Sequence, residues 1–517
     1  MNLFLITSEQ LNGLLVAASE KLSIFTQLNQ AFAELVALLK AIFFYPILGM
    51  PIIVLWLIIG GVYFTFRMGF INLRGFTHAL AVLSGKYQSS SGDDDDQEGE
   101  VSPFQAASTA LSATVGLGSI AGSAIAIQMG GPGAVVWMSI AGFLGMSSKF
   151  VECTLGQKYR QVKPDGSVAG GPMYYISSGL ADLGLRPLGS VLGVLFAILC
   201  VLGTFGAGNM FQANQSYAAL AGVLPFIAER SWFYGLIMSL LVGVVIIGGI
   251  SRIGVVTSRL VPVVVLFYIS GCLWIILSNW QIIPEAIGII FKGAFSPTAI
   301  QGGLVGVIVQ GFRRAAFSNG AGIGSAAIAH SATRNDQPVR EGIVASIEPL
   351  VDTLIICNLT AISIVITGVY KSFATGEASG IQLTAAAFGT VVEWFPTVLA
   401  IAVILFAFSN IVSWSYYGEQ AWMYLFGEAS TLLYKFIFIV FVFLGSVIEL
   451  GVVLDFSDMM LIAMSVPNLL GCFLLAGKVG DDLQVYMEKL RLERAVAGSS
   501  DAKATTTEQE YTGSSKK

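Results

Sequence analysis

The chain has 517 residues, of which 55% are hydrophobic and only 11% are charged. Soluble proteins carry about 25% charged residues, so this composition excludes a soluble globular protein. The five cysteines and two histidines are too few and too scattered for a disulfide framework or a Cys/His metal site. The net charge of −5 leaves no basic footprint for nucleic acid, which we exclude as a partner.

Apolar windows long enough to cross a bilayer recur along the chain, since a core about 30 Å thick needs about 20 apolar residues. We find eleven, near 49–69, 104–129, 131–155, 188–212, 233–250, 258–280, 300–331, 341–366, 395–419, 431–455 and 458–478. They predict an all-α integral membrane protein with about 11 transmembrane helices. Charged residues interrupt the apolar stretches of residues 1–48, which we interpret as an N-terminal interfacial segment and not as a cleaved signal peptide.

The distribution of Lys and Arg predicts the orientation, because positively charged loops stay in the cytoplasm. Connections on one side carry 17 such residues and those on the other carry 5. An odd number of helices then places the N-terminus outside and the C-terminus inside. Residues 70–103 form an acidic cytoplasmic loop in this interpretation, and residues 479–517 form a polar cytoplasmic tail that we expect to be disordered beyond about residue 495.

Two of the predicted spans contain clustered glycines. Gly116-Leu117-Gly118-Ser119 and Gly322-Ile323-Gly324-Ser325 lie 206 residues apart. Each glycine costs about 1 kcal/mol in a helix interior relative to alanine, so the clusters predict helices that unwind at mid-span. The alternative is that small residues simply let neighbouring helices pack closely.

The matching positions of the two clusters favour the broken-helix interpretation. Each cluster opens a set of five predicted helices, 104–280 and 300–478, and an odd number per half requires the halves to be inverted. Unwound backbone exposes N–H groups suited to a carboxylate and carbonyls suited to a small hard cation. Unsatisfied backbone in lipid costs several kcal/mol per group, so we expect an anionic substrate group and a cation to bind there together.

Longer strings of the sequence resemble a known family. The matching strings are EVSPFQAASTALSATVGLGSIAG, GGPGAVVWM, GGPMYYI, GGISRIGVVTSRLVP, FRRAAFSNGAGIGSA and SNIVSWSYYGEQAW, spread over about residues 48–480. They look like the alanine/glycine:cation symporter family, also called sodium:alanine symporters. The resemblance implies a leucine-transporter-type fold of two inverted five-helix repeats, preceded by one extra N-terminal helix at 49–69.

The same resemblance implies the activity. Members are secondary active transporters, not enzymes, that import alanine or glycine with sodium through alternating access. Expected partners are therefore the small amino acid, Na⁺ as the coupling ion and the lipid bilayer of a prokaryotic inner membrane, with no cofactor. The oligomeric state stays open.

The resemblance also implies a set of site residues. The expected substrate-binding residues are Gly116, Leu117, Gly118, Ser119, Asn209, Phe211, Gln212, Asn214, Phe317, Gly320, Gly322 and Trp414. The expected sodium-binding residues are Ser112, Val115, Ser409 and Asn410. The alternative roles are interhelical hydrogen bonding for the Asn and Gln side chains and an interfacial position for Trp414.

The chain departs from the family pattern at several of these positions. Ser119 replaces an asparagine, Gly320 and Ile323 replace a glutamate and a methionine, and Asn410 replaces a threonine. These changes put the electrostatics near the substrate ammonium and the details of cation coordination in doubt.

Charged residues inside predicted spans are the remaining functional candidates. Glu348 and Asp352 lie one helical turn apart and need a cation or protonation. We expect Arg313 or Arg314 to take part in an outer-gate ion pair, the alternative being a structural or snorkelling charge. His330 is interpreted as an interface residue.

Three other functions compete with sodium symport. A proton-coupled transporter needs an acidic or histidine relay, and an ion channel usually needs symmetric subunits around a pore. An intramembrane enzyme needs a nucleophile with a base, or metal ligands, for which the apolar spans supply no matching set.

Overall fold

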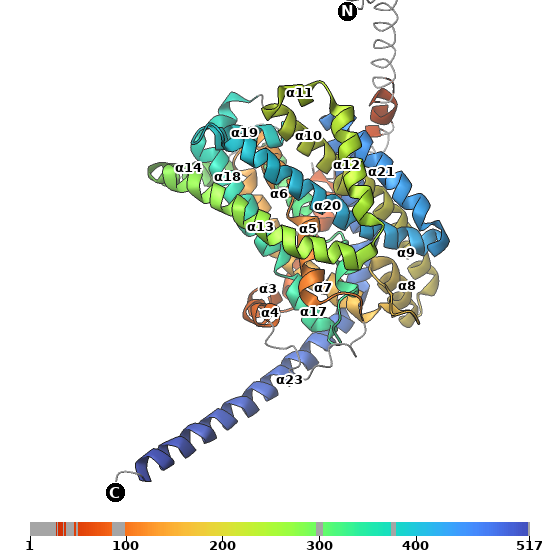
Figure 1. Cartoon of the computed structure of the whole chain (residues 1–517). Coiled ribbons are helices and arrows are strands. Elements are labelled where there is room, and N and C mark those ends of the chain that lie inside the picture. The colour runs from red at the N-terminus through yellow and green to blue at the C-terminus, as the bar shows by residue number, and fades with distance from the viewer. Residues whose placement is uncertain are drawn as a thin grey trace, which may run out of the picture.

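The structure is a computed structural model that describes residues 27, 29–34, 36–37, 46–47, 50–84, 99–295, 303–373 and 379–514. Backbone groups in lipid must be satisfied within the segment, which favours helices, and helices dominate the described residues (Figure 1). Eight of them are long and apolar enough to cross a membrane. Strands in this part of the chain form two short antiparallel pairs, β1 (Pro46–Ile47) with β2 (Met50–Pro51) and β3 (Gln161–Val162) with β4 (Val168–Ala169).

Among the helices before the first interruption is α2, a shorter apolar helix of 16 residues at Ile52–Arg67 that packs against α7 and α23. Two short helices follow, α3 (Ile71–Arg74) and α4 (Phe76–Leu83), where we predicted the start of a loop. The acidic run of that loop, and most of the predicted interfacial segment at 1–48, lie outside the described residues.

The first predicted half contains nine α-helices and one π-helix among the described residues. They are α5 (Pro103–Thr114), α6 (Leu117–Gly130), α7 (Ala134–Lys158), α8 (Pro172–Asp182), α9 (Arg186–Phe205), η2 (Gly206–Met210), α10 (Phe211–Val223), α11 (Pro225–Ala228), α12 (Ser231–Ile246) and α13 (Gly249–Ser278). Next come η3 (Trp280–Ile282) and α14 (Ile283–Ala294).

The second predicted half has a comparable series of elements. They are α15 (Gly303–Asn319), α16 (Ala326–Ser331), α17 (Pro338–Ala345), η4 (Leu350–Cys357), α18 (Asn358–Thr367), η5 (Val369–Ser372), α19 (Ile381–Gly389), α20 (Phe395–Phe426), η6 (Glu428–Ser430), α21 (Thr431–Val447), α22 (Leu450–Ala463) and α23 (Ser465–Ser514).

The α5–α6 segment forms the centre of the bundle. Its most apolar window is 94% buried, against 44% for α13 and 33% for the window of α21. Leu266 and Trp274 of α13 are more than 60% exposed, as expected for side chains that face lipid. Helices α11 and α19 lie at one end of the bundle, and α3, α4 and α17 lie at the other (Figure 1).

The C-terminal tail departs from the prediction. We expected disorder beyond about residue 495, but α23 continues to Ser514 and projects from the end that carries α3 and α4 (Figure 1). The sequence there, ERAVAGSSDAKA, contains several good helix formers, and the polar composition that suggested disorder is compatible with a solvated helix.

Candidate functional site

The first interruption separates α5 from α6. Helix α5 starts with a capping box in which Ser102 and Gln105 satisfy each other's backbone N–H groups, and it ends at Thr114. Val115 is extended, and Gly116 has φ −160° and ψ −147° before α6 starts at Leu117. A Cβ atom on Gly116 would lie 2.8 Å from Nδ2 of Asn410, so the close approach of α20 requires glycine there.

The second interruption runs from Gly320 to Ser325, between α15 and α16. Gly320, Gly322 and Gly324 have φ values of 65°, 83° and 91°, a left-handed conformation that glycine adopts without steric cost. The Asn319 side chain accepts a hydrogen bond from the Ala321 N–H at 2.8 Å and so stabilises the turn. Both interruptions that the glycine clusters predicted are therefore present.

The two interruptions lie side by side in the buried centre. A Cβ atom on Gly118 would lie 3.3 Å from Cα of Ser318 and 3.4 Å from the Phe317 carbonyl oxygen. The hydroxyl oxygens of Ser318 and Ser119 lie 3.1 Å apart. Glycine at position 118 thus lets α6 and the end of α15 touch backbone to backbone.

A buried carboxyl group lies where the interruptions meet. Asp352, on the π-helix η4, accepts hydrogen bonds from the hydroxyls of Ser119, Ser318 (2.5 Å) and Thr353 (2.9 Å). Asp352 is completely buried, and no ion pair within 4 Å links it to a cation among the described residues. Ser119 and Ser318 come from the two different interrupted helices, so Asp352 connects both. The sequence identifies Asp352 as an intramembrane charge but does not place it in the site, because its contacts are distant in sequence.

The first N–H group of α6 is held by a neighbouring amide. The Leu117 N–H donates to Oε1 of Gln212 at 3.3 Å, and the Gln212 amide nitrogen donates to the Ala207 carbonyl at 3.0 Å. N–H groups in the first turn of a helix lack intrahelical acceptors, and an amide oxygen occupies here the position that a carboxylate oxygen would take. This geometry suits a substrate carboxylate near Leu117, Gly118 and Gln212.

Helices α5 and α20 hold the residues expected at the sodium site. The Asn410 amide donates to the Ser112 and Ala113 carbonyls, each at 3.0 Å. Ser112 Oγ, Asn410 Oδ1 and Ser413 Oγ are buried and have no hydrogen-bond partner in the described chain. Ser409 donates to the Phe406 carbonyl of its own helix at 3.0 Å, and Val115 lies at the end of α5. Uncompensated buried oxygens are costly, and a small hard cation would satisfy them.

Two of the expected substrate residues point elsewhere. The Asn209 amide donates to the Phe438 carbonyl at 2.8 Å, and the Asn214 amide donates to the Gly445 and Ile448 carbonyls at 3.1 and 2.8 Å. These acceptors lie on α21 and just after it. Both asparagines therefore make the interhelical hydrogen bonds that the alternative interpretation describes.

The aromatic candidates have separate surroundings. The rings of Phe211 and Phe317 meet edge to face, with centroids 4.8 Å apart. Trp414 donates from Nε1 to the Ala113 carbonyl at 2.9 Å, and its ring lies against Gly208. Trp414 is 5% exposed, so it is a packed link between α5 and η2 and not an interfacial residue.

The other two positions that depart from the family pattern, Gly320 and Ile323, lie in the second interruption. A Cβ atom on Gly320 would be 3.8 Å from Nζ of Lys149, so the side chain missing there would have faced a buried ammonium. Ile323 is fully buried, and Gly322 lies against Leu57 of α2.

A group of buried charged side chains, the arginine layer, lies next to the Phe211–Phe317 pair. The Arg314 guanidinium is 5.1 Å from the centre of the Phe317 ring and forms an ion pair with Asp458 of α22. Arg313 pairs with Asp458 at 2.6 Å and with Asp455 at 3.4 Å. Asp458 is thus the acidic partner that the sequence did not identify. Helix α19 packs on α6 and α10, where the Ile381 N–H donates to Gln215 at 2.9 Å.

A second buried charge network lies on the other side of the interruptions. Lys149 pairs with Glu348 at 2.9 Å, and His330 bridges Glu348 at 2.5 Å and Glu341 at 2.6 Å. His330 is fully buried, and it lies one residue before the end of α16; its place near the end of a predicted span had indicated an interface residue, and that position stays a prediction. Glu348 belongs to this charge network, whereas Asp352 contacts the hydroxyl groups between the two interrupted helices.

We expect neutralisation of the arginine layer to impair the transport that the sequence resemblance implies. In Arg314→Gln, Asp458 keeps only Arg313 as a charged partner, and the cation above the Phe317 ring is lost. Uptake of radiolabelled alanine, the substrate that the resemblance implies, into proteoliposomes should fall about tenfold or more, since removing one member of a buried ion pair costs about 3–5 kcal/mol. Arg230→Gln, on an exposed residue, is the control. Full uptake activity of both Arg314→Gln and Arg313→Gln would exclude a role of these arginines in the predicted outer-gate ion pair.

Comparisons with known proteins agree with this geometry. Residues 32–498 match the sodium:alanine symporter family. The sodium/alanine symporter AgcS of Methanococcus maripaludis is 38% identical over 442 residues, covering 85% of this chain and 94% of AgcS. The probable sodium/glutamine symporter GlnT of Bacillus subtilis is 34% identical, covering 85% of this chain and 88% of GlnT. Among solved structures, MhsT in complex with L-phenylalanine matches with a TM-score of 0.54 at 13% identity, covering 75% of this chain and 99% of MhsT. The MhsT likeness shows a shared fold.

Proposed function

Because the chain belongs to the sodium:alanine symporter family, we propose that it imports alanine or glycine together with Na⁺ by alternating access. Membership makes the chain a multi-pass membrane transporter and not an enzyme, with sodium as the coupled ion. Two points go beyond family membership and are our proposal: that the substrate is a small neutral amino acid, and that transport proceeds by alternating access. AgcS is named a sodium/alanine symporter and GlnT a probable sodium/glutamine symporter, so substrates differ within the family.

The contact between the two interrupted helices carries this proposal. Gly118 touches Ser318 at the backbone, and the first N–H of α6 faces Gln212. In the proposed complex, the substrate carboxylate displaces the Gln212 amide oxygen from the Leu117 N–H and binds the first turn of α6. The Phe211–Phe317 pair then covers the small side chain and excludes larger ones, since a surplus methylene is otherwise worth only about 1–3 kcal/mol.

Sodium is proposed to bind between α5 and α20. Ser112 Oγ, Asn410 Oδ1 and Ser413 Oγ supply oxygens that lack partners. The Asn410 amide nitrogen donates to the Ser112 carbonyl at 3.0 Å, and the second lone pair of that carbonyl oxygen is suited to coordinate the cation. We accordingly keep Ser112 and Asn410 as the principal sodium residues, with Val115 and Ser409 beside them.

The eleven-helix, inverted-repeat architecture is part of the proposal. Eight long apolar helices, the shorter α2 and α12 and the interrupted α15–α16 segment would give eleven crossings. Helix α2 would be the extra N-terminal helix. The end with α3, α4 and α17 carries Arg67, Arg74 and Arg340, which supports a cytoplasmic position for that end and for the C-terminus in an inner membrane.

Counterflow in proteoliposomes tests the function. Vesicles preloaded with unlabelled alanine should accumulate labelled alanine, and an inward sodium gradient without preloading should drive uptake. Potassium in place of sodium is the control for the coupling ion. If the uptake of labelled alanine depended neither on the preloaded alanine nor on the sodium gradient, and the vesicles showed ionic conductance, the protein would instead be a channel.

Proton coupling is a second candidate that Asp352 favours. A buried carboxyl group with hydroxyl donors and no paired cation is suited to gain and lose a proton. An inward proton gradient at constant sodium should then drive uptake. Unchanged uptake under that gradient would exclude proton coupling and leave Asp352 to the sodium-coupled cycle.

A further inference from the structure

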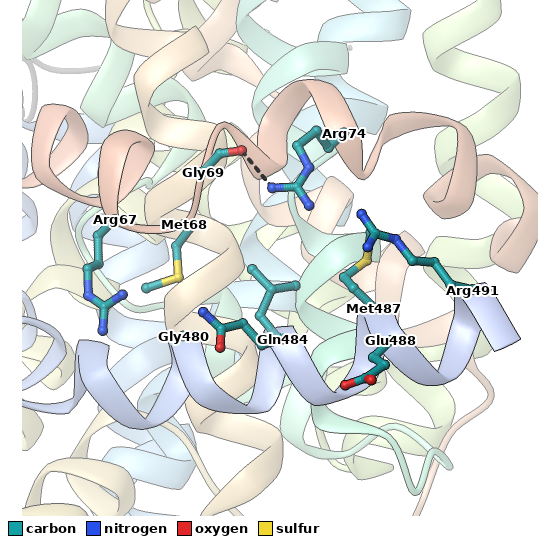
Figure 2. A pocket seen from close by; sticks show the side chains of 10 residues that line it. Arg67, Met68, Gly69, Arg74, Gly480, Gln484, Met487, Glu488 and Arg491 are labelled. Carbon is teal, nitrogen blue, oxygen red and sulfur yellow. Dashed lines mark hydrogen bonds between the residues drawn. The ribbon is translucent and has the colours of Figure 1, made fainter.

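A basic cavity lies between the end of α2, the α3 turn and α23, away from the interrupted helices. Its volume is about 370 Å³, and its polar lining includes Arg67, Arg74, Arg491, Gln484 and Glu488. In Figure 2, Arg67 and Arg74 come from the N-terminal helices, and Arg491 rises from α23 towards α3 while Glu488 points the other way. Segments more than 400 residues apart in sequence thus build one cavity.

The charge of this cavity is unbalanced. Three guanidinium groups face one carboxylate, and within the described chain none of the three arginines forms an ion pair within 4 Å. Arg74 donates one hydrogen bond to the Gly69 carbonyl at 3.2 Å, which leaves most of its five N–H donors for a ligand. Guanidinium groups bind phosphate with paired hydrogen bonds, so the cavity suits a phosphate monoanion or dianion.

An apolar groove begins at the same arginine. A surface hollow of about 740 Å³ runs along α2, lined by Ile58, Ile59, Val62, Tyr63, Phe66 and Arg67. Phe66 is 68% exposed and Ile59 54% exposed. Arg67 therefore lies where the basic cavity meets the apolar groove. A phospholipid needs both, a basic site for its headgroup and an apolar surface for its acyl chain.

The exposed side chains of helices α3 and α4 suit a position of this junction at the edge of the bilayer. Leu73 is 62% exposed and Leu80 47% exposed, and Arg74 lies beside them. Exposed apolar side chains next to arginine are typical of short helices in the membrane interface. A free phosphate would fill the cavity but leave the groove on α2 uncovered.

From these observations we propose that the cavity and groove form a binding site for an anionic glycerophospholipid. The phosphate contacts Arg67, Arg74 and Arg491, and an acyl chain lies along α2 over Ile59 and Phe66. The lipid joins α2 to α23, and α2 in turn contacts the second interruption through Leu57 and Gly322. This site needs membrane insertion but no transport cycle, so its test is independent of the proposed function.

Thermal unfolding of the purified protein in detergent tests the site. Added phosphatidylglycerol should raise the Tm by several degrees, because a ligand that binds only the folded state stabilises it, whereas phosphatidylcholine should not. The variant with Arg67→Gln, Arg74→Gln and Arg491→Gln should lose this rise. A matched variant, Arg252→Gln with Arg259→Gln, removes exposed arginines outside the cavity and should keep it.

Two further experiments distinguish a phospholipid from free phosphate and loss of binding from misfolding of the variant. Inorganic phosphate at the same concentration should give no rise; a rise equal to that with phosphatidylglycerol would overturn the lipid assignment. If the triple variant does not fold, Arg491→Gln alone should reduce the number of phosphatidylglycerol molecules retained in native mass spectrometry. Equal retention by Arg491→Gln and the wild type, or equal Tm rises with both lipids, would contradict the proposal.

Discussion

Asparagine in place of Asp352 is expected to reduce sodium-driven alanine uptake at least tenfold. Asp352 accepts hydrogen bonds from Ser119 of α6 and Ser318 of α15, so its carboxylate links both interrupted helices. Hydrogen bonds to a charged group contribute about 1.5–3 kcal/mol, and a tenfold change in rate corresponds to about 1.4 kcal/mol. The asparagine has nearly the same shape but neither the charge nor the second acceptor oxygen.

Initial rates of labelled alanine uptake at several sodium concentrations provide the measurement. We expect a lower maximal rate and a weaker sodium dependence in Asp352→Asn. Asp182→Asn is a suitable control, because Asp182 is exposed and pairs with Lys478 at the surface, where such pairs contribute about 0–1 kcal/mol. An Asp352→Asn protein with wild-type rates and sodium dependence would remove Asp352 from the mechanism.

The second large effect concerns stability. Lys149→Met should lower the free energy of unfolding by about 3–5 kcal/mol, because it leaves Glu348 buried with His330 as its remaining basic partner. Lys149 is completely buried, so water cannot replace the lost ammonium. Unfolding of the detergent-solubilised protein, followed by loss of helical circular dichroism, measures this change.

A matched lysine provides the comparison. Lys158 pairs with Asp482, and both side chains are about one third exposed, so Lys158→Met should cost less than about 1 kcal/mol. In the double variant Lys149→Met with Glu348→Gln, part of the loss should be recovered, since Glu348 no longer places a carboxylate beside the missing ammonium. Equal stability of Lys149→Met and Lys158→Met would show that the buried network does not hold the fold together.

The sequence predicts the interrupted helices because their cause is local. Glycines at 320, 322 and 324 adopt positive φ values, and this conformational freedom is a property of the residue itself. Apolar windows likewise predict helices in lipid. The sequence does not place the turn between α21 and α22, which falls at Ile448–Glu449 inside a predicted span, since apolar composition continues across it.

The partners of polar side chains are harder to predict because they depend on packing between distant segments. Asn209 and Gln212 lie on neighbouring turns, yet Asn209 contacts α21 and Gln212 contacts α6. The π-helix η2, at Gly206–Met210, changes the angular spacing between them. Asp458 is 144 residues from Arg314, and no periodicity in the sequence relates the two.

The surroundings of the two interruptions have a mechanical consequence. Asn410 of α20 lies against Gly116 in the first, and Leu57 of α2 lies against Gly322 in the second. Helix α2 precedes both halves and approaches its neighbours closely at Gly60 and Gly61, which lie against Leu469 and Leu144. The two interruptions, similar in sequence, therefore touch different neighbours, and in the proposed transport cycle any displacement of the second one would have to carry α2 along or break its contact with Leu57.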